Sequence, residues 1–294
     1  MSQTIATPQW GIISLCCVHL RAESRHGSEM VTQALMGTPV RILDHENEWY
    51  KIETPEGYHA WVHPLSIAVK SDEDMSCWRK SERYIYSCMQ GYLYDKPQRN
   101  ALPISDMTLG CIIESCSKKK RGYIEVILPD GRKGYAKASE VTKLDVWSQQ
   151  QFDVERLEKE ARMMMGTTYL WGGMSVKGAD CSGFTKLLYY SQGIILLRDA
   201  SQQATCGEKI DYTNINNLQR GDLLFFTGAS GRINHVAIYL ENGRYIHSSG
   251  CVKINSLLPD DNLYNNLQVH SARRIATAIG SDGIVKASEH SWYF

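Results

Sequence analysis

The sequence has no long hydrophobic run, no excess of either charge and no cysteines in a Cys-x-x-Cys pair. No segment approaches the roughly 18 apolar residues of a membrane-spanning helix, so no membrane span is predicted. Lysine plus arginine and aspartate plus glutamate both number 32, which disfavours a broad basic surface for nucleic acid. The basic cluster at residues 118–121 stands beside Gly122 and is interpreted as a solvated hairpin tip.

The nine cysteines are odd in number and irregular in spacing. This pattern favours reduced, buried thiols over a disulfide framework. No metal-ligand spacing occurs, so neither a metal nor another cofactor is predicted. Residues 1–9 are polar and lack the apolar core of a signal peptide. A native N-terminus therefore predicts a cytoplasmic protein, and a trimmed one a cell-envelope protein.

Short strand candidates separated by turn signals fill the first part of the chain. They span residues 11–18, 31–35, 39–45, 49–53 and 58–62. Five brief strands in about sixty residues predict a small, strongly bent β-barrel over residues 10–70. A second copy, expected over residues 78–145, repeats the order of aromatic and glycine positions. Residues 75–79 are interpreted as the linker between the copies.

Four landmarks of the first copy occur in order. They are Leu-Arg-Ala-Glu at 20–23, Gly-Thr-Pro-Val at 37–40, Glu-Trp-Tyr-Lys-Ile at 48–52 and Gly-Tyr-His-Ala-Trp-Val at 57–62. This order resembles the bacterial SH3-like domain. In the second copy, Gly-Arg-Lys-Gly-Tyr-Ala at 131–136 matches the last landmark, although the copy has drifted further.

The period of apolar residues becomes helical after residue 150. Over 152–165 the residues Val154, Leu157, Ala161 and Met164 fall on one face, which is typical of core packing. A glycine-rich loop and a helix over 182–191 follow. Strands are then predicted over 223–226, 235–240, 244–249 and 275–278. Residues 150–294 are therefore expected to form an α+β domain.

Cys181 stands where the glycine-rich loop becomes a helix that ends at Gly193. Helix N-terminal N–H groups and the helix dipole favour an anion there, so we interpret Cys181 as a nucleophile rather than a buried thiol. Tyr169 and Trp171 belong to the same loop, and Trp171 is expected to form a wall of the cleft.

A cysteine nucleophile requires a base, and the base requires a group that orients it. His235 and His247 stand on either side of an expected hairpin turn, although each alone would be read as a structural histidine. A two-residue Asn-Gly turn would put them on opposite faces. A three-residue loop with left-handed Gly243 pairs Ala237 with His247 and makes His235 a diagonal neighbour. We predict the three-residue loop.

Four motifs of this region resemble the NlpC-type cell-wall cysteine peptidases. They are Asp-Cys-Ser-Gly-Phe at 180–184, Arg-Gly-Asp-Leu at 220–223, Asn-His-Val-Ala-Ile-Tyr at 234–239 and Ile-His-Ser at 246–248. The resemblance implies a papain-like fold in which Cys181 is the nucleophile, His235 the base and His247 the orienting residue. With two SH3-like barrels in front of this α+β domain, the chain is more narrowly similar to the dipeptidyl-peptidase VI group.

That group cleaves after the γ-linked D-Glu of murein peptides with a free N-terminal L-Ala, and its first SH3-like domain blocks intact wall. The positions that match its substrate-binding residues are Glu29, Tyr58, Tyr169, Asp180, Ser182, Arg198 and Asp199. The group places a serine directly after the Arg-Asp pair, whereas here Ala200 precedes Ser201. A buried ammonium requires a carboxylate partner, and Glu29 and Asp199 are the candidates.

The resemblance thus implies an enzyme of murein-peptide recycling. We expect a monomer, and composition predicts no nucleic-acid or membrane partner. Its expected substrate is L-Ala-γ-D-Glu-L-Lys or the diaminopimelate analogue. The thiol is expected to be ionised by the helix N-terminus and protonated His235, with the Cys181 N–H as oxyanion donor. Alternatives are an amidase or endopeptidase of intact peptidoglycan and a non-catalytic wall-binding protein. Glu29 could equally be an exposed loop carboxylate, and Tyr58 part of the barrel core.

Overall fold

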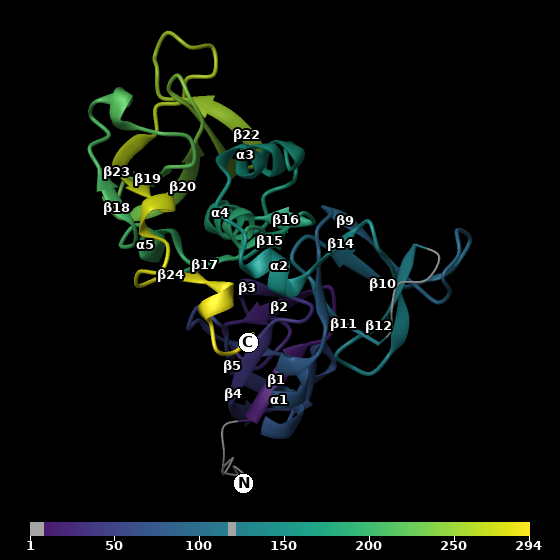
Figure 1. Cartoon of the computed structure of the whole chain (residues 1–294). Helices are drawn as coiled ribbons and strands as arrows, with labels where there is room; N and C mark the ends of the chain where they lie inside the picture. Colours follow the sequence, from purple (N-terminus) through teal and green to yellow (C-terminus); the bar gives the residue numbers. More distant parts are fainter. Residues whose placement is uncertain (1–8, 117–121) are drawn as a thin grey trace. The chain divides into compact units, whose positions relative to one another are not determined.

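The computed structural model describes residues 9–116 and 122–294, which fall into two compact units. The N-terminal unit extends to Gln149 and includes the segment Ser288–Phe294, and the second unit spans Gln150–Ala287 (Figure 1). The predicted hairpin tip at 118–121 and most of the polar start at 1–9 lie outside the described residues. Within the described ranges, no helix is long and apolar enough to cross a membrane.

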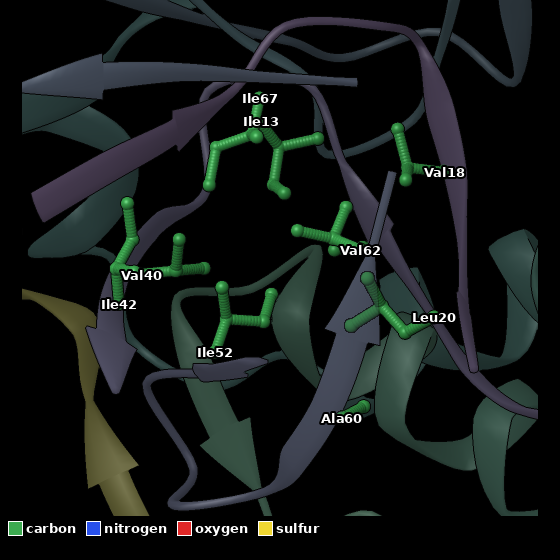
Figure 2. Close-up of a cluster of buried hydrophobic side chains, with 10 residues drawn as sticks. Ile13, Val18, Leu20, Val40, Ile42, Ile52, Ala60, Val62 and Ile67 are labelled. Atoms are coloured by element: carbon green, nitrogen blue, oxygen red, sulfur yellow. The ribbon is translucent and has the colours of Figure 1, made fainter. Parts of the chain in front are cut away.

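The first barrel is a seven-stranded antiparallel sheet in the order β3-β2-β6-β5-β4-β1-β7. Its strands are β1 Gln9–Ile13, β2 Cys17–Arg21, β3 Met30–Leu35, β4 Pro39–Glu46, β5 Trp49–Glu53, β6 His59–Val62 and β7 Ile67–Lys70, with the 3-10 turn η1 Pro64–Ser66 before β7. Figure 2 shows side chains such as Ile13, Val40 and Ile52 converging on one core. The predicted single strand over 11–18 is wrong, because the chain bends at 14–16 between β1 and β2.

The second barrel repeats the topology of the first. Its order, β10-β9-β13-β12-β11-β8-β14, becomes the order of the first sheet when seven is subtracted from each label. The strands are β8 Arg83–Tyr86, β9 Gln90–Tyr94, β10 Pro103–Thr108, β11 Ile112–Ser115, β12 Tyr123–Ile127, β13 Lys133–Lys137 and β14 Val141–Lys143, followed by α2 Leu144–Ser148. The shared strand order supports the predicted internal duplication.

A helix stands where the sequence predicted only a linker over 75–79. Helix α1 spans Asp72–Lys80 and is capped by Ser71. The Ser71 hydroxyl accepts from the Asp74 N–H, and the Asp74 carboxylate accepts from the Ser71 N–H, both at 3.0 Å. This reciprocal capping satisfies two donors at the helix start, and the Ser-x-x-Asp spacing was its sequence signal.

The second unit combines helices with a six-stranded sheet in the order β18-β23-β19-β20-β21-β22 (Figure 1). This arrangement confirms the α+β class. Its helices are α3 Val154–Met163, α4 Cys181–Tyr190 and α5 Ala200–Gln203, with the 3-10 turns η2 Ile215–Asn217, η3 Ala276–Ala278 and η4 Ala287–Glu289, the last reaching into the C-terminal segment. The strands of the sheet are β18 Glu208–Ile210, β19 Leu223–Thr227, β20 Ile233–Tyr239, β21 Arg244–Ser249, β22 Cys251–Ser256 and β23 Gln268–Arg274. Two short pairs are β15 Met174–Ser175 with β16 Gly178–Ala179 and β17 Ile194–Leu196 with β24 Ile284–Lys286.

Helix α4 is the centre of the second unit, because every one of its residues is buried. It contacts β15, β17, β20 and β21. The predicted core face of α3 is also confirmed, since Leu157, Ala161 and Met164 are buried. The strand predicted over 275–278 is wrong. That segment forms η3, and the sheet strand is β23, which ends at Arg274.

The last seven residues pack with the N-terminal unit, although the sequence-based range 150–294 included them in the catalytic domain. His290 Nε2 lies 2.9 Å from the Pro55 carbonyl oxygen. The Trp292 and Trp10 rings meet edge to face with centroids 5.3 Å apart. These contacts give His290 and Trp292 a structural role in the N-terminal unit.

A buried ion pair joins the start of β19 to the end of β23. Asp222 is 1% exposed, and its carboxylate accepts from Arg274 Nε and Nη2 at 2.8 Å each and from the Gln219 N–H at 2.8 Å. Every hydrogen bond compensates part of the cost of burying the charge. The ion pair therefore fixes the position of β19, the strand with which β20 pairs.

Replacing Asp222 by Ala leaves Arg274 without its buried partner. We expect the free energy of unfolding to fall by about 3–5 kcal/mol in denaturant titration. Arg244→Gln is the control, because the Arg244 side chain of the Arg244–Asp261 pair is 49% exposed, and such a pair contributes about 0–1 kcal/mol. Equal losses in the two variants would contradict this account of the fold.

Candidate active site

Cys181 is the first residue of α4, and Asp180 caps the helix. The Asp180 carboxylate accepts from the Gly183 N–H at 2.7 Å and from the Gly172 N–H at 2.9 Å. One oxygen thus holds the helix start and the other holds the glycine-rich loop. A side chain at Gly183 would place its Cβ 2.0 Å from the Gly173 carbonyl oxygen, so this close approach requires glycine.

Arg198 forms a buried ion pair with the same carboxylate. It is 1% exposed and donates to Asp180 through Nη2 at 2.6 Å and Nη1 at 3.1 Å. Nη1 also donates to the Ser182 hydroxyl at 2.8 Å. A bidentate, fully hydrogen-bonded pair is the arrangement in which buried charges are tolerated. Three of the predicted substrate-binding residues therefore meet in one network that fixes the nucleophile.

The turn between β20 and β21 is tight and bulged. The Arg244 N–H donates to the Glu241 carbonyl at 2.9 Å, and the Leu240 N–H donates to the Arg244 carbonyl at 2.9 Å. Both Asn242 (φ 51°) and Gly243 (φ 78°) are left-handed, whereas the prediction required this only of Gly243. Leu240 and Glu241 on one strand thus oppose Arg244 on the other. This bulge shifts the register by one residue relative to a two-residue Asn-Gly turn.

That register brings the two histidines together. Ile238 pairs with Ile246, and continuing the pairing puts Ala237 opposite His247, as the three-residue loop predicted. His235 is then a diagonal neighbour on the same face. His235 Nε2 lies 2.6 Å from His247 Nδ1, so the two imidazoles share a hydrogen bond.

The thiol lies against the strand that carries His235. Cys181 Sγ is 4.0 Å from the Asn234 carbonyl oxygen, and the Val236 N–H also points at the sulfur. The Ser248 hydroxyl donates to the Ala179 carbonyl at 2.7 Å and ties the hairpin to the loop before Cys181. Because Nε2 of His235 faces His247, Nδ1 is the ring nitrogen left for the thiol.

Burial disfavours the charged forms of Cys181, His235 and His247. Burial, and then the negative charge of Asp180, raise the pKa of the Cys181 thiol to about 11. Burial lowers the pKa of His235 to about 3, helped by neighbouring His247, and burial lowers the pKa of His247 to about 4. These shifts oppose the expected standing thiolate beside a protonated His235, which stays a prediction. A helix N-terminus typically contributes only about 0.3–1 kcal/mol, less than desolvating a thiolate costs.

Comparisons with known proteins show the family of the chain. The sequence model of the NlpC/P60 family matches residues 166–273, and that of the bacterial SH3 domain matches residues 18–67. "Probable endopeptidase NlpC" of Escherichia coli is 38% identical over 123 residues, which are 40% of this chain and 76% of that protein. The chain belongs to the NlpC/P60 family.

Two further relatives align over most of the chain. A gamma-D-glutamyl-L-lysine dipeptidyl-peptidase of Bacillus cereus is 28% identical over 255 residues, which are 80% of this chain and 72% of that protein. Dipeptidyl-peptidase 6 of Lysinibacillus sphaericus is 28% identical over 280 residues, 92% of this chain and 98% of that protein. The crystal structure of an NlpC/P60 family protein from Bacillus cereus shares the fold, with a TM-score of 0.76 at 22% identity over 90% of this chain and 99% of that one.

The other predicted residues of the NlpC/P60 domain differ in how deeply they are buried. Burial and the nearby Cys181 and Asp180 raise the pKa of half-buried Tyr169 to about 12. Trp171 is 60% exposed. Asp199 is half-buried at the start of α5, and burial raises the pKa of its carboxyl group despite the opposing charge of Arg198. Ser201 is exposed on α5.

Glu29 and Tyr58 belong to the first barrel of the N-terminal unit. Glu29 is exposed just before β3. Tyr58 is half-buried and packs against the barrel core, which agrees with its alternative reading. Their contacts with substrate stay predictions. In the part of the chain that the structure describes, no cluster of His, Cys, Asp or Glu side chains is suited to a metal ion.

Asn255 on β22 is a site residue that sequence reasoning missed. Its Oδ1 lies 2.9 Å from His247 Nε2. Asn255 pairs with Tyr245 across the strands, which makes it the diagonal neighbour of His247. The same diagonal rule that related His235 to His247 would have found it, had β22 been predicted.

The depressed pKa of His247 has a consequence for stability. Unfolded His247 binds a proton below its ordinary pKa of about 6.5, whereas the folded residue stays neutral to about pH 4. Folding stability from this residue is thus present above pH 6.5 and is lost as the pH falls towards 4. Between pH 7.5 and 5, wild type should lose about 1–2 kcal/mol more unfolding free energy than His247→Gln. Equal losses in denaturant titrations would contradict the burial effect.

Proposed function

We propose that the chain is a cysteine endopeptidase of murein-peptide recycling. It cleaves the bond between γ-D-Glu and L-Lys or meso-diaminopimelate in peptides with a free N-terminal L-Ala. One arrangement carries this proposal. The thiol of Cys181, at the start of α4, lies against β20, the strand that contains His235. His235 in turn shares a hydrogen bond with His247. The names of the relatives that align over most of the chain support the substrate class.

The reaction begins with proton transfer inside a neutral pair. His235 Nδ1 takes the thiol proton while Cys181 Sγ attacks the carbonyl carbon of the γ-amide and forms the C–S bond. The oxyanion accepts a hydrogen bond from the Cys181 N–H, which has no intrahelical acceptor at the first helical position. The C–N bond then breaks, and His235 returns the proton to the leaving amine.

Hydrolysis of the thioester reverses the roles. His235 removes a proton from water, and the resulting hydroxide attacks the acyl carbon. The C–S bond breaks, the acid product leaves and the proton returns to the thiolate. Both charges of the Cys181–His235 pair thus exist only during turnover, which agrees with the pKa shifts of both groups.

Recognition of the free amine is assigned to carboxylates. Asp199 is half-buried next to Arg198, and burial already raises the pKa of its carboxyl group. A substrate ammonium would compensate the desolvation of this carboxylate, whereas an acylated amine would not. Glu29 and Tyr58 remain predicted partners of the same amine.

The substrate assignment is tested with L-Ala-γ-D-Glu-L-Lys and its N-acetyl derivative, with products followed by mass spectrometry. We expect cleavage of the free-amine peptide only. Cys181→Ala should abolish turnover. Cys77→Ala is the control, because Cys77 is an exposed residue of α1, and it should retain full activity.

Variants of the carboxylates refine the test. Asp199→Asn and Glu29→Gln should each lower kcat/KM for the free-amine peptide by about tenfold to a hundredfold, as expected for losing a charged hydrogen bond. Equal cleavage of both peptides would remove Asp199 and Glu29 from this role. Cleavage of intact peptidoglycan would favour a wall endopeptidase or amidase, and binding without cleavage would favour a binding protein.

A further inference from the structure

We propose that Asn255 is a positioning residue that fixes where the protons lie along the line Asn255–His247–His235. It thereby keeps the lone pair of His235 Nδ1 free for the Cys181 thiol. This inference rests on the proposed function, in which His235 is the base. It adds a fourth side chain to the three that the sequence predicted.

The orientation of the Asn255 amide is set by the backbone. Asn255 Nδ2 donates to the Leu263 carbonyl oxygen at 2.9 Å. The same carbonyl accepts from the Ser256 N–H at 2.9 Å, so its position is held by β22 itself. Because a carbonyl oxygen can only accept, the amide must present its NH₂ group to Leu263 and its oxygen to His247.

The proton positions of both rings follow from that orientation. Asn255 Oδ1 lies 2.9 Å from His247 Nε2, so this nitrogen carries the hydrogen. A neutral imidazole has one N–H, and His247 Nδ1 therefore accepts. The hydrogen of the 2.6 Å bond then belongs to His235 Nε2. His235 Nδ1 is left with its lone pair, the form that can take a proton from a thiol.

The reversed amide would disable the base. It would bring Asn255 Oδ1 against the Leu263 carbonyl, where two acceptors repel each other. It would also make His247 Nε2 an acceptor and reverse both hydrogen bonds. His235 Nδ1 would then carry a hydrogen and could not accept the thiol proton.

The side chain that orients His247 is neutral, although a charged residue stands nearby on the same strand. The charged neighbour on β22 is Lys253, which stands opposite His247 and acts to lower the pKa of both histidines. The hydrogen bond that His247 Nε2 donates to Asn255 Oδ1 acts in the opposite direction on the pKa of His247. The amide oxygen of Asn255 therefore orients the His247 ring. It also favours transient positive charge on that ring without burying a permanent anion.

The test combines two variants with two readouts. Asn255→Ala removes the acceptor, whereas Asn255→Asp keeps an oxygen for His247 but cannot donate to Leu263. We expect kcat to fall by about tenfold to a hundredfold in Asn255→Ala, with KM nearly unchanged. Asn255→Asp should restore part of this loss, because one carboxylate oxygen still accepts from His247 Nε2 although the other meets the Leu263 carbonyl. The control is Asn262→Ala, at an exposed position in the loop between β22 and β23 that also contains Leu263. This variant should match wild type.

The second readout is ¹⁵N NMR of the imidazole nitrogens in the substrate-free protein. Wild type should show His235 protonated at Nε2, and Asn255→Ala should show a mixture of tautomers. A purely structural role would impair Asn255→Asp at least as much as Asn255→Ala. That result, or a wild-type His235 protonated at Nδ1, would overturn the inference. Failure of the proposed function would appear instead as wild type that cleaves neither peptide, which leaves the NMR result interpretable.

Discussion

The buried carboxylate of Asp180 is the constraint on which the second unit depends. It accepts hydrogen bonds from the glycine-rich loop, from the first turn of α4 and from Arg198. Without it, the loop and the helix would have no common anchor, and the thiol would have no fixed place. Its position beside the nucleophile has an electrostatic consequence, because a negative charge next to Cys181 opposes a second one on the sulfur.

In the proposed reaction, the charges of this site form only during turnover. The thiol and both imidazoles are buried, and burial shifts the pKa of each group away from its charged form. The proposed proton transfer from Cys181 to His235 would create two opposite charges in a region of low dielectric, where they attract strongly. The geometry that permits this transfer comes from the bulged turn after β20, which places the rings of His235 and His247 within hydrogen-bond distance.

Local sequence signals predicted the parts of the site whose positions depend on residues that are close in the sequence. The change from glycines to helical periodicity located Cys181 at the start of α4, and loop length predicted the register of His235 and His247. Element boundaries were less accessible, because the bend at 14–16 depends on hydrogen bonds to distant residues, such as that from the Ser14 N–H to the Ser66 carbonyl. Asn255 was missed because β22 was not predicted. The orientation of its amide also depends on the Leu263 carbonyl, which the loop after β22 brings back to it.

The charge of the nucleophile also could not be predicted from sequence, since helix position alone does not give the depth of burial. Cys181 is 6% exposed, and this burial outweighs the helix N-terminus. The most direct test is the pH dependence of Cys181 alkylation by iodoacetamide, followed by mass spectrometry of the Cys181 peptide. An uncharged resting thiol predicts a rate that rises continuously from neutral pH towards about pH 11. A rate that already reaches its plateau at neutral pH would show a standing thiolate and contradict this account.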